Sequence, residues 1–218
     1  MIVPESVENN GWVNRPQDIR VDLLLIGQMV QPGSRVLDVG CGDGALLDFL
    51  VQERGADARG IELSQDGVNA CVARGLSVIQ GDADKDLRDY PSKTFDYVIL
   101  SQTLQATHRP RDVLRELLRI GRRAIVSFPN FGNWRVRFDL LLSGRMPNTG
   151  TLDNPWYSTP NIHLCTIRDF VVLCDEMGIE IEQSLAINAR GRPMPWARSV
   201  LLANWFADQG LFVLKSRD

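Results

Sequence analysis

The chain has 218 residues, of which 44% are hydrophobic and 23% are charged, and its net charge is −3. This length and composition favour a single domain, residues 1–218, with a sizeable core, and the slight acidity without a basic stripe argues against a nucleic-acid-binding protein. No run approaches the roughly 18 apolar residues of a membrane span, and the first residues lack the basic-then-apolar order of a secretory signal, so we expect a cytoplasmic protein.

Residues 17–31 predict an amphipathic helix, with Ile19, Leu23, Ile26 and Val30 at the spacing of one stripe. After it, short apolar runs and helical patterns alternate along the chain. The predicted strands are 35–39, 58–62, 77–80, 95–100, 122–128, 179–187 and 211–215, and the predicted helices between them are 44–54, 64–74, 110–120 and 166–178. This alternation is typical of an α/β fold with a doubly wound, seven-stranded, mostly parallel sheet.

A glycine-rich loop joins the first predicted strand to the helix that follows it. Residues 38–44 read Asp-Val-Gly-Cys-Gly-Asp-Gly, and the helix opens at Ala45. Glycine lets the backbone turn tightly and approach a ligand closely, while the start of the helix offers unpaired N–H groups, so the loop predicts a nucleotide-like ligand. Because Gly40, Gly42 and Ala45 also satisfy the pattern of dinucleotide-binding folds, the loop alone does not separate a nicotinamide cofactor from S-adenosylmethionine.

Polar residues at the ends of the next three strands extend this prediction. Glu62 ends the second strand at the spacing at which a carboxylate binds the ribose hydroxyls of an adenosine. Asp82 follows the third strand and offers an acceptor to an adenine amine, and Ser101 follows the fourth. In open α/β sheets, ligands lie beyond the carboxyl ends of the strands, so we expect these residues and Gly40 to line one crevice.

The order of these landmarks between residues 34 and 128 resembles that of class I S-adenosylmethionine-dependent methyltransferases, which implies a Rossmann-like fold. An acid precedes the glycine loop, an acid closes the second strand, Gly-Asp follows the third, and Phe-Asp opens the fourth. The resemblance implies a site for S-adenosylmethionine or S-adenosylhomocysteine. Its residues are Asp38, Gly40 and Gly42 for the methionine part, Glu62 for the ribose, and Asp82 with Ala83 for the adenine; Cys41, Leu63 and Ser101 complete the predicted cofactor-binding set. The alternative for each is strand capping or turn chemistry, and it applies most to the Gly-Asp turn after the third strand.

Longer motifs, most of them in the second half of the chain, resemble the methionine biosynthesis protein W (MetW) family. They are Ser127–Arg135 and Trp156–Thr166, together with Ser101–Gln105 and Gly144–Pro147. The resemblance implies a methyltransferase-like protein of methionine biosynthesis that associates with homoserine O-acyltransferase, the enzyme that activates homoserine. Two hypotheses remain open: an accessory or regulatory subunit of that enzyme, whose crevice acts as a sensor, or an active methyltransferase on an unknown small acceptor.

Residues 129–165 form the first of two segments that lie outside the sheet and helices common to class I methyltransferases. They are rich in Trp, Asn, Pro and Gly and carry three arginines. Connections of this length usually act as lids or binding surfaces, so we expect a lid or an interface insertion.

The second such segment, residues 188–210, is an insertion before the last strand. It places Val200, Leu201, Trp205 and Phe206 at helical spacing, a pattern that is more often core than interface. Trp and Arg nevertheless often anchor interfaces. Contact with the acyltransferase is therefore expected through Trp134 and Arg135 of the first segment, or through Trp196 and Arg198 of the second.

The pattern of reactive residues points to few catalytic assignments. His108 is the candidate general base, but its position shortly before Pro110, at the start of a predicted helix, favours a structural or capping role. His163 either caps a helix or lines the acceptor side. The chain holds no G-x-S-x-G elbow, so we do not expect it to be the acyltransferase itself.

The cysteines indicate reduced thiols and no metal site. Cys41, Cys71, Cys165 and Cys174 form no C-x-x-C pair, and neither histidine has ligand spacing to any of them on one element.

Overall fold

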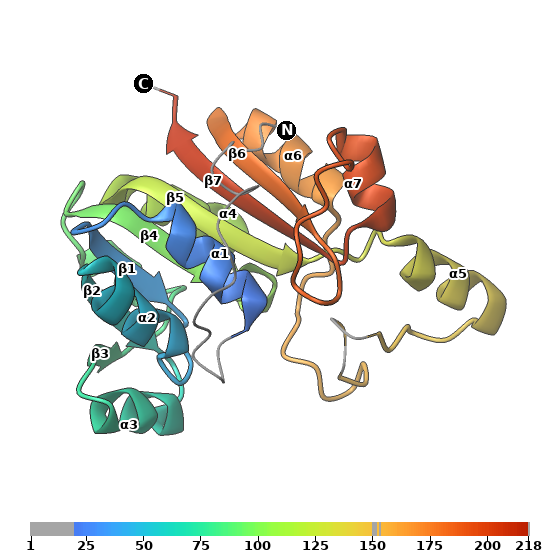
Figure 1. Ribbon diagram of the computed structural model, residues 1–218. Helices are drawn as coiled ribbons and strands as arrows, with labels where there is room; N and C mark the ends of the chain where they lie inside the picture. Colours follow the sequence, from blue (N-terminus) through green and yellow to red (C-terminus); the bar gives the residue numbers. More distant parts are fainter. Residues whose placement is uncertain (1–19, 150–151, 153, 218) are drawn as a thin grey trace.

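The computed structural model describes residues 20–149, 152 and 154–217. Seven strands form one sheet in the order β3-β2-β1-β4-β5-β7-β6 (Figure 1). The strands are β1 (Arg35–Val39), β2 (Asp57–Glu62), β3 (Ser77–Gln80), β4 (Phe95–Ser101), β5 (Gly121–Pro129), β6 (Ile179–Ile187) and β7 (Gln209–Ser216). Strand β7 is antiparallel to both of its neighbours, whereas the other adjacent pairs are parallel. The predicted seven-stranded, mostly parallel, doubly wound fold is confirmed.

Helices cover both faces of this sheet, and one more, α5 (Trp134–Ser143), stands apart from it (Figure 1). The others are α1 (Val21–Met29), α2 (Ala45–Arg54), α3 (Gln65–Ala73), α4 (Pro110–Ile120), α6 (Ile167–Glu176) and α7 (Val200–Phe206), with short 3₁₀ helices η2 (Asp86–Asp89) and η3 (Leu104–Ala106). Among the described residues, none of these helices is long and apolar enough to cross a membrane. The first helix begins later than predicted, at residue 21, and the predicted stripe position Ile19 lies outside the described residues.

Alternate residues of each central strand enter two separate hydrophobic clusters. In β4, Tyr97 and Ile99 belong to the cluster with α1 and α2, whereas Val98 and Leu100 belong to the cluster with α4 and α6. This period of two is what a sheet buried on both faces requires. The strand order reverses between β1 and β4, because β2 and β3 lie on one side of this pair and β5 to β7 on the other. Ligands of such folds bind at this point, beyond the carboxyl ends of the strands.

Helix α5 was not predicted within residues 129–165. Its ends carry ordinary signals: the Asn133 side chain accepts a hydrogen bond from the Arg135 N–H at 2.9 Å, and Gly144 closes the helix with φ of 64°. An apolar pattern that faces the core would have indicated this helix, but Val136 is its only buried residue. Instead, α5 stands away from the end of the sheet (Figure 1).

The prediction that the stripe of Val200, Leu201, Trp205 and Phe206 is core is wrong for Leu201 and Phe206, whereas Val200 packs against the core. The buried residues of α7 are Ala203 and Asn204, whereas Leu201 is 64% exposed and Phe206 is 40% exposed. The inner face of α7 carries Ala203 and Asn204, so the helix backbone lies close to the core and Leu201 and Phe206 point outward. Phe206 packs instead against Trp196, with ring centroids 5.3 Å apart.

Candidate functional site

The glycine loop between β1 and α2 lies at the reversal point of the sheet. Gly40, Gly42 and Gly44 have φ of 76°, 57° and 80°, which is the left-handed region that favours glycine. A Cβ at Gly40 would lie 2.6 Å from Thr103 Oγ1, just after β4, whereas a Cβ at Gly42 would meet nothing within 4 Å. The loop therefore packs tightly against the end of β4 and is open at Gly42.

Glu62, at the end of β2, holds this loop from the side. Its Oε2 accepts a hydrogen bond from the Gly42 N–H at 2.8 Å, and its Oε1 accepts one from the Ser64 N–H at 2.9 Å. Each carboxylate oxygen retains a further lone pair, so the same group has capacity for two hydroxyl donors of a ligand. Leu63, the next residue, is 67% exposed.

Asp38, at the end of β1, is a buried carboxyl group without its full set of partners. It is 2% exposed, and its Oδ1 accepts no hydrogen bond from any described residue. Burial and, to a lesser extent, the negative charge of Glu62 raise the pKa of Asp38, while Arg20 opposes the shift; the result is a pKa of about 7. A buried acceptor that lacks a donor fits a ligand that brings one, such as the ammonium group of an amino acid.

Asp82 and Ala83, after β3, lie in a tight turn. The Asp82 carboxylate accepts hydrogen bonds from the Asp84 N–H at 2.9 Å and pairs with Lys85 Nζ at 2.8 Å. The hydrogen bond from Lys85 lowers the pKa of Asp82. Ala83 packs against the core. The turn chemistry that was the alternative for Asp82 is thus present, and its contact with an adenine stays a prediction.

A polar cluster that the sequence reasoning did not single out borders the end of β4. Gln102 adopts the left-handed region with φ of 51°, and its Nε2 donates to Asp22 Oδ2 at 3.0 Å. Asp22 is 4% exposed and also pairs with the Arg20 guanidinium at 2.9 Å. Beside the cluster, the Ser101 and Ser127 hydroxyls share a hydrogen bond at 3.2 Å. The sequence contains one indication of this cluster: Asp22 is the single acid in the apolar run Val21–Met29. An acid in a buried run needs a hydrogen-bond or ion-pair partner.

His108 lies at the start of α4, away from the glycine loop in sequence and exposed over 77% of its side chain. Its backbone N–H donates to Asp84 Oδ2 at 2.8 Å, and the Arg109 N–H donates to Asp84 Oδ1 at 2.9 Å. Asp84 therefore caps the residues that lead into α4, in line with the structural alternative for His108. A role as general base stays a prediction.

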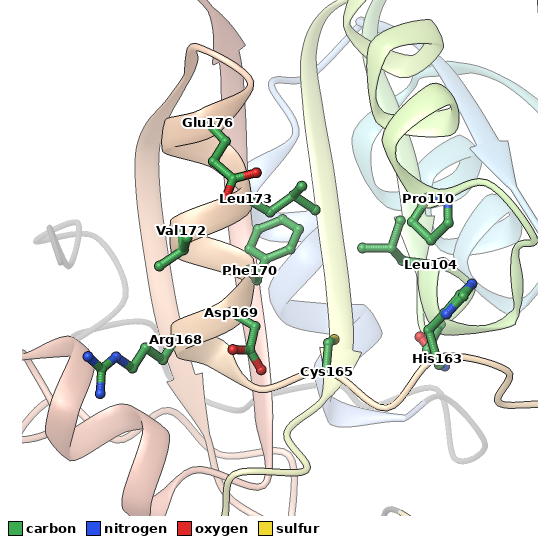
Figure 2. Close-up of a pocket in the computed structure, with 11 residues that line it drawn as sticks. Leu104, Pro110, His163, Cys165, Arg168, Asp169, Phe170, Val172, Leu173 and Glu176 are labelled. Atoms are coloured by element: carbon green, nitrogen blue, oxygen red, sulfur yellow. The ribbon is translucent and has the colours of Figure 1, made fainter.

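A hollow of about 400 Å³ lies between α6 and the segment from η3 to the start of α4. Figure 2 shows Phe170 and Leu173 of α6 facing Leu104 and Pro110 across this hollow, with His163 at its edge. None of the nine predicted cofactor residues lines it. Leu104, which lines the hollow, directly follows Thr103, and Thr103 packs against Gly40. The hollow and the glycine loop therefore lie on either side of one short segment.

The thiols are free, as the spacing predicted. Burial raises the pKa values of Cys165 and Cys174 to about 12, and that of Cys41 is raised further by burial and the nearby Asp38 charge. Cys41 and Cys71 lie beside the glycine loop with their sulfurs 4.0 Å apart. In the part of the chain that the structure describes, no group of three or more His, Cys, Asp or Glu side chains is placed to hold a metal ion.

Comparison with known proteins identifies relatives along most of the chain. The family model described as "Methionine biosynthesis protein MetW" matches residues 20–214. A relative from Rhodopirellula baltica, described as bifunctional methionine biosynthesis protein MetXA/MetW, is 36% identical over 78% of the chain and 29% of its own length. A fatty-acid O-methyltransferase from Mycolicibacterium smegmatis is 39% identical over 40% of the chain and 33% of its own length. The chain thus spans about a third of the length of these curated relatives.

Solved structures share the fold at low sequence identity. A TehB-like S-adenosylmethionine-dependent methyltransferase from Corynebacterium glutamicum has a TM-score of 0.60 and 17% identity, covering 93% of the chain and 90% of that protein. An S-adenosylmethionine-dependent methyltransferase from Mesorhizobium loti has a TM-score of 0.61 and 16% identity, covering 89% of the chain and 97% of that protein. At this identity the likeness shows the class I methyltransferase fold and leaves activity open.

Proposed function

Because the chain belongs to the methionine biosynthesis protein MetW family, we propose that it binds S-adenosylmethionine or S-adenosylhomocysteine and acts as an accessory or regulatory subunit of homoserine O-acyltransferase. The family and the fold make it a methyltransferase-like protein of methionine biosynthesis. Binding of the cofactor and association with the acyltransferase go beyond this family assignment, and a different observation supports each of them.

The observation that carries the cofactor step is the incomplete hydrogen bonding of Asp38 beneath a loop that is open at Gly42. S-adenosylmethionine brings an ammonium group, two ribose hydroxyls and an adenine to such a crevice. Asp38 would accept from the ammonium group, and Glu62 would accept from the hydroxyls with its free lone pairs. When bound, the ligand would supply an electrophilic methyl group, whereas the residues of this chain would bind and orient it.

Replacement of Glu62 by Ala tests this assignment. We expect the affinity for S-adenosylhomocysteine to fall by the ~1.5–3 kcal/mol typical of a hydrogen bond to a charged group, which is roughly 10- to 150-fold in Kd. Titration calorimetry measures the change, and Glu53→Ala, an exposed acid of α2, is the matched control. An affinity equal to that of the control would remove Glu62 from the site. If the wild type binds NADH and neither adenosyl ligand, the cofactor proposal fails.

The partner step is supported by the relative whose name joins MetXA and MetW in one protein. Joining two proteins in one chain keeps each at a high effective concentration near the other, which is useful when the two work together. If a ligand in the crevice binds more tightly to the assembled state, assembly must tighten ligand binding by the same factor. S-adenosylmethionine would then report methionine supply to the enzyme that activates homoserine.

Co-elution and activity measurements test the partner. We expect the chain to co-elute with purified homoserine O-acyltransferase at micromolar concentrations and to change its rate of acyl transfer, with a further change when S-adenosylmethionine is added. Unchanged activity together with separate elution would remove the accessory-subunit proposal.

An active methyltransferase is the second candidate, and the hollow next to the end of β4 favours it. That hollow has mainly apolar walls and the size of a small-molecule site. One relative is described as a fatty-acid O-methyltransferase, although it matches only 40% of the chain. Incubation with methyl-labelled S-adenosylmethionine and cell metabolites would reveal a methylated product if this candidate is correct.

A further inference from the structure

We propose that α5 is the docking helix for the acyltransferase and inserts one apolar face into a groove of that enzyme. This inference rests on the partner named under the proposed function and adds the surface that binds it. The face consists of Trp134, Phe138, Leu141 and Leu142, called here the α5 stripe. The spacing i, i+4, i+7, i+8 places the four side chains on one side of a helix.

The α5 stripe is open to solvent along its whole length. Its members are 39%, 47%, 76% and 81% exposed in chain order, so exposure increases away from the body of the protein. The Trp134 and Phe138 rings touch edge to face, with centroids 6.2 Å apart. Scattered single apolar residues on a surface are common, but a continuous apolar face of about two and a half helical turns marks a binding site. Helices that present anchors at this spacing characteristically lie in hydrophobic grooves of their partners.

The base of α5 is fixed rigidly to the fold. Asn133, which is 3% exposed, donates through Nδ2 to the carbonyl oxygens of Phe206 at 3.2 Å and Ala207 at 3.0 Å. Asn130, which is 2% exposed, donates to the carbonyls of Asn204 at 3.0 Å and Ala207 at 2.8 Å. These bonds tie the start of α5 to the end of α7. A helix that is oriented before binding loses less entropy on docking than a flexible segment would.

The charges of α5 favour a protein partner over a lipid surface. Arg137 donates through Nε to the Gly132 carbonyl at 2.6 Å and lies over the Trp205 ring at 4.6 Å, so this cation is held by the body of the protein. Asp139 adds a negative charge in the middle of the helix. Binding to anionic lipid needs free cations along the polar face, which α5 has in small number. Trp134 and Arg135 form a pair, with the Arg135 guanidinium 5.5 Å from the Trp134 ring. Trp and Arg are among the residue types most enriched at the energetic centres of protein interfaces.

Two acidic substitutions in the α5 stripe test the proposal. In the variant Phe138→Glu with Leu141→Glu, binding of purified homoserine O-acyltransferase should weaken at least ~100-fold, because each change places a charge in a dehydrated contact. The control is Val72→Glu on α3, which converts a residue of comparable exposure, 58%, on the side of the sheet away from α5. Both variants should bind S-adenosylhomocysteine as the wild type does, since the changed side chains are exposed.

The possible results distinguish failure of α5 as the docking surface from failure of the acyltransferase as the partner. Loss of binding in the stripe variant alone supports the docking helix. Equal binding by wild type, control and stripe variant would overturn the docking surface and leave the partner in place. A wild type that does not bind the acyltransferase would overturn both. If the variant loses only self-association in light scattering, or only sedimentation with phosphatidylglycerol vesicles, the stripe belongs to a second copy or to a membrane, and the proposal is wrong.

Discussion

Replacement of Gly42 by Val is expected to abolish measurable binding of S-adenosylmethionine, with at least ~100-fold loss of affinity, while the protein remains folded. A Cβ at Gly42 meets no protein atom within 4 Å, so a valine side chain would fit only by occupying the open side of the loop, where the ligand is proposed to lie. The substitution also strains the backbone, because φ at Gly42 is 57° and a β-branched residue avoids that region.

Gly55→Val separates these two effects. Gly55 has φ of 59° and also has nothing within 4 Å of a Cβ, but it closes α2 at the opposite edge of the sheet. Thermal unfolding should show similar destabilisation of both variants, by about 1–3 kcal/mol. Calorimetry should then show binding by Gly55→Val and none by Gly42→Val. Equal affinities in the two variants would mean that the open side of the loop is not the ligand site.

The stability of the ligand-free protein should carry a component that falls as the pH rises from about 4 to about 7. The ordinary pKa of an aspartate side chain is 3.8, and the pKa of Asp38 in the folded protein is about 7. Between these two pH values, the folded state therefore binds one more proton than the unfolded state. Stability therefore decreases with pH across this window and is constant with respect to Asp38 above it. A shift of this size corresponds to at most about 4 kcal/mol.

Comparison with Asp38→Asn isolates this component from other titrating groups. Urea unfolding at several pH values between 4 and 8 gives the free energy of unfolding of both proteins. We expect the wild type to lose stability relative to the variant as the pH rises. A non-titrating control is Asn69→Ala on the surface of α3, whose profile should parallel the wild type. Parallel profiles of wild type and Asp38→Asn would show that Asp38 is already ionised in the folded, ligand-free protein.

The same titration predicts how ligand binding depends on pH. An ammonium group beside Asp38 favours the charged carboxylate, so the affinity for S-adenosylmethionine should increase as the pH rises through 7. In Asp38→Asn this increase should disappear. A pH-independent affinity in the wild type would mean that the cation of the ligand does not reach this carboxyl group.

Much of the fold could be predicted because its signals are local. All seven strands lie within two residues of their predicted bounds, since apolar runs of β-branched residues bounded by turn residues depend on neighbours in the chain. The loop at residues 38–44 and the acid Glu62 were also visible, because three glycines after a strand and an acid closing the next strand are patterns of spacing. Their contact, from the Gly42 N–H to the Glu62 carboxylate at 2.8 Å, follows once β1 and β2 pair in parallel.

By itself, the sequence determined the order and type of the strands and most helices, the glycine loop and the family resemblance. Only the tertiary structure decided that Asp38 lacks a hydrogen-bond partner, that Gln102 reaches Asp22 across 80 positions of sequence, and that α5 and α7 turn their large apolar residues outward. The physical reason is that burial and pairing depend on which distant segments meet. An apolar stripe has the same spacing whether it faces the core or a partner. An aspartate is the same residue in the sequence whether or not a hydrogen-bond donor lies beside it in the fold.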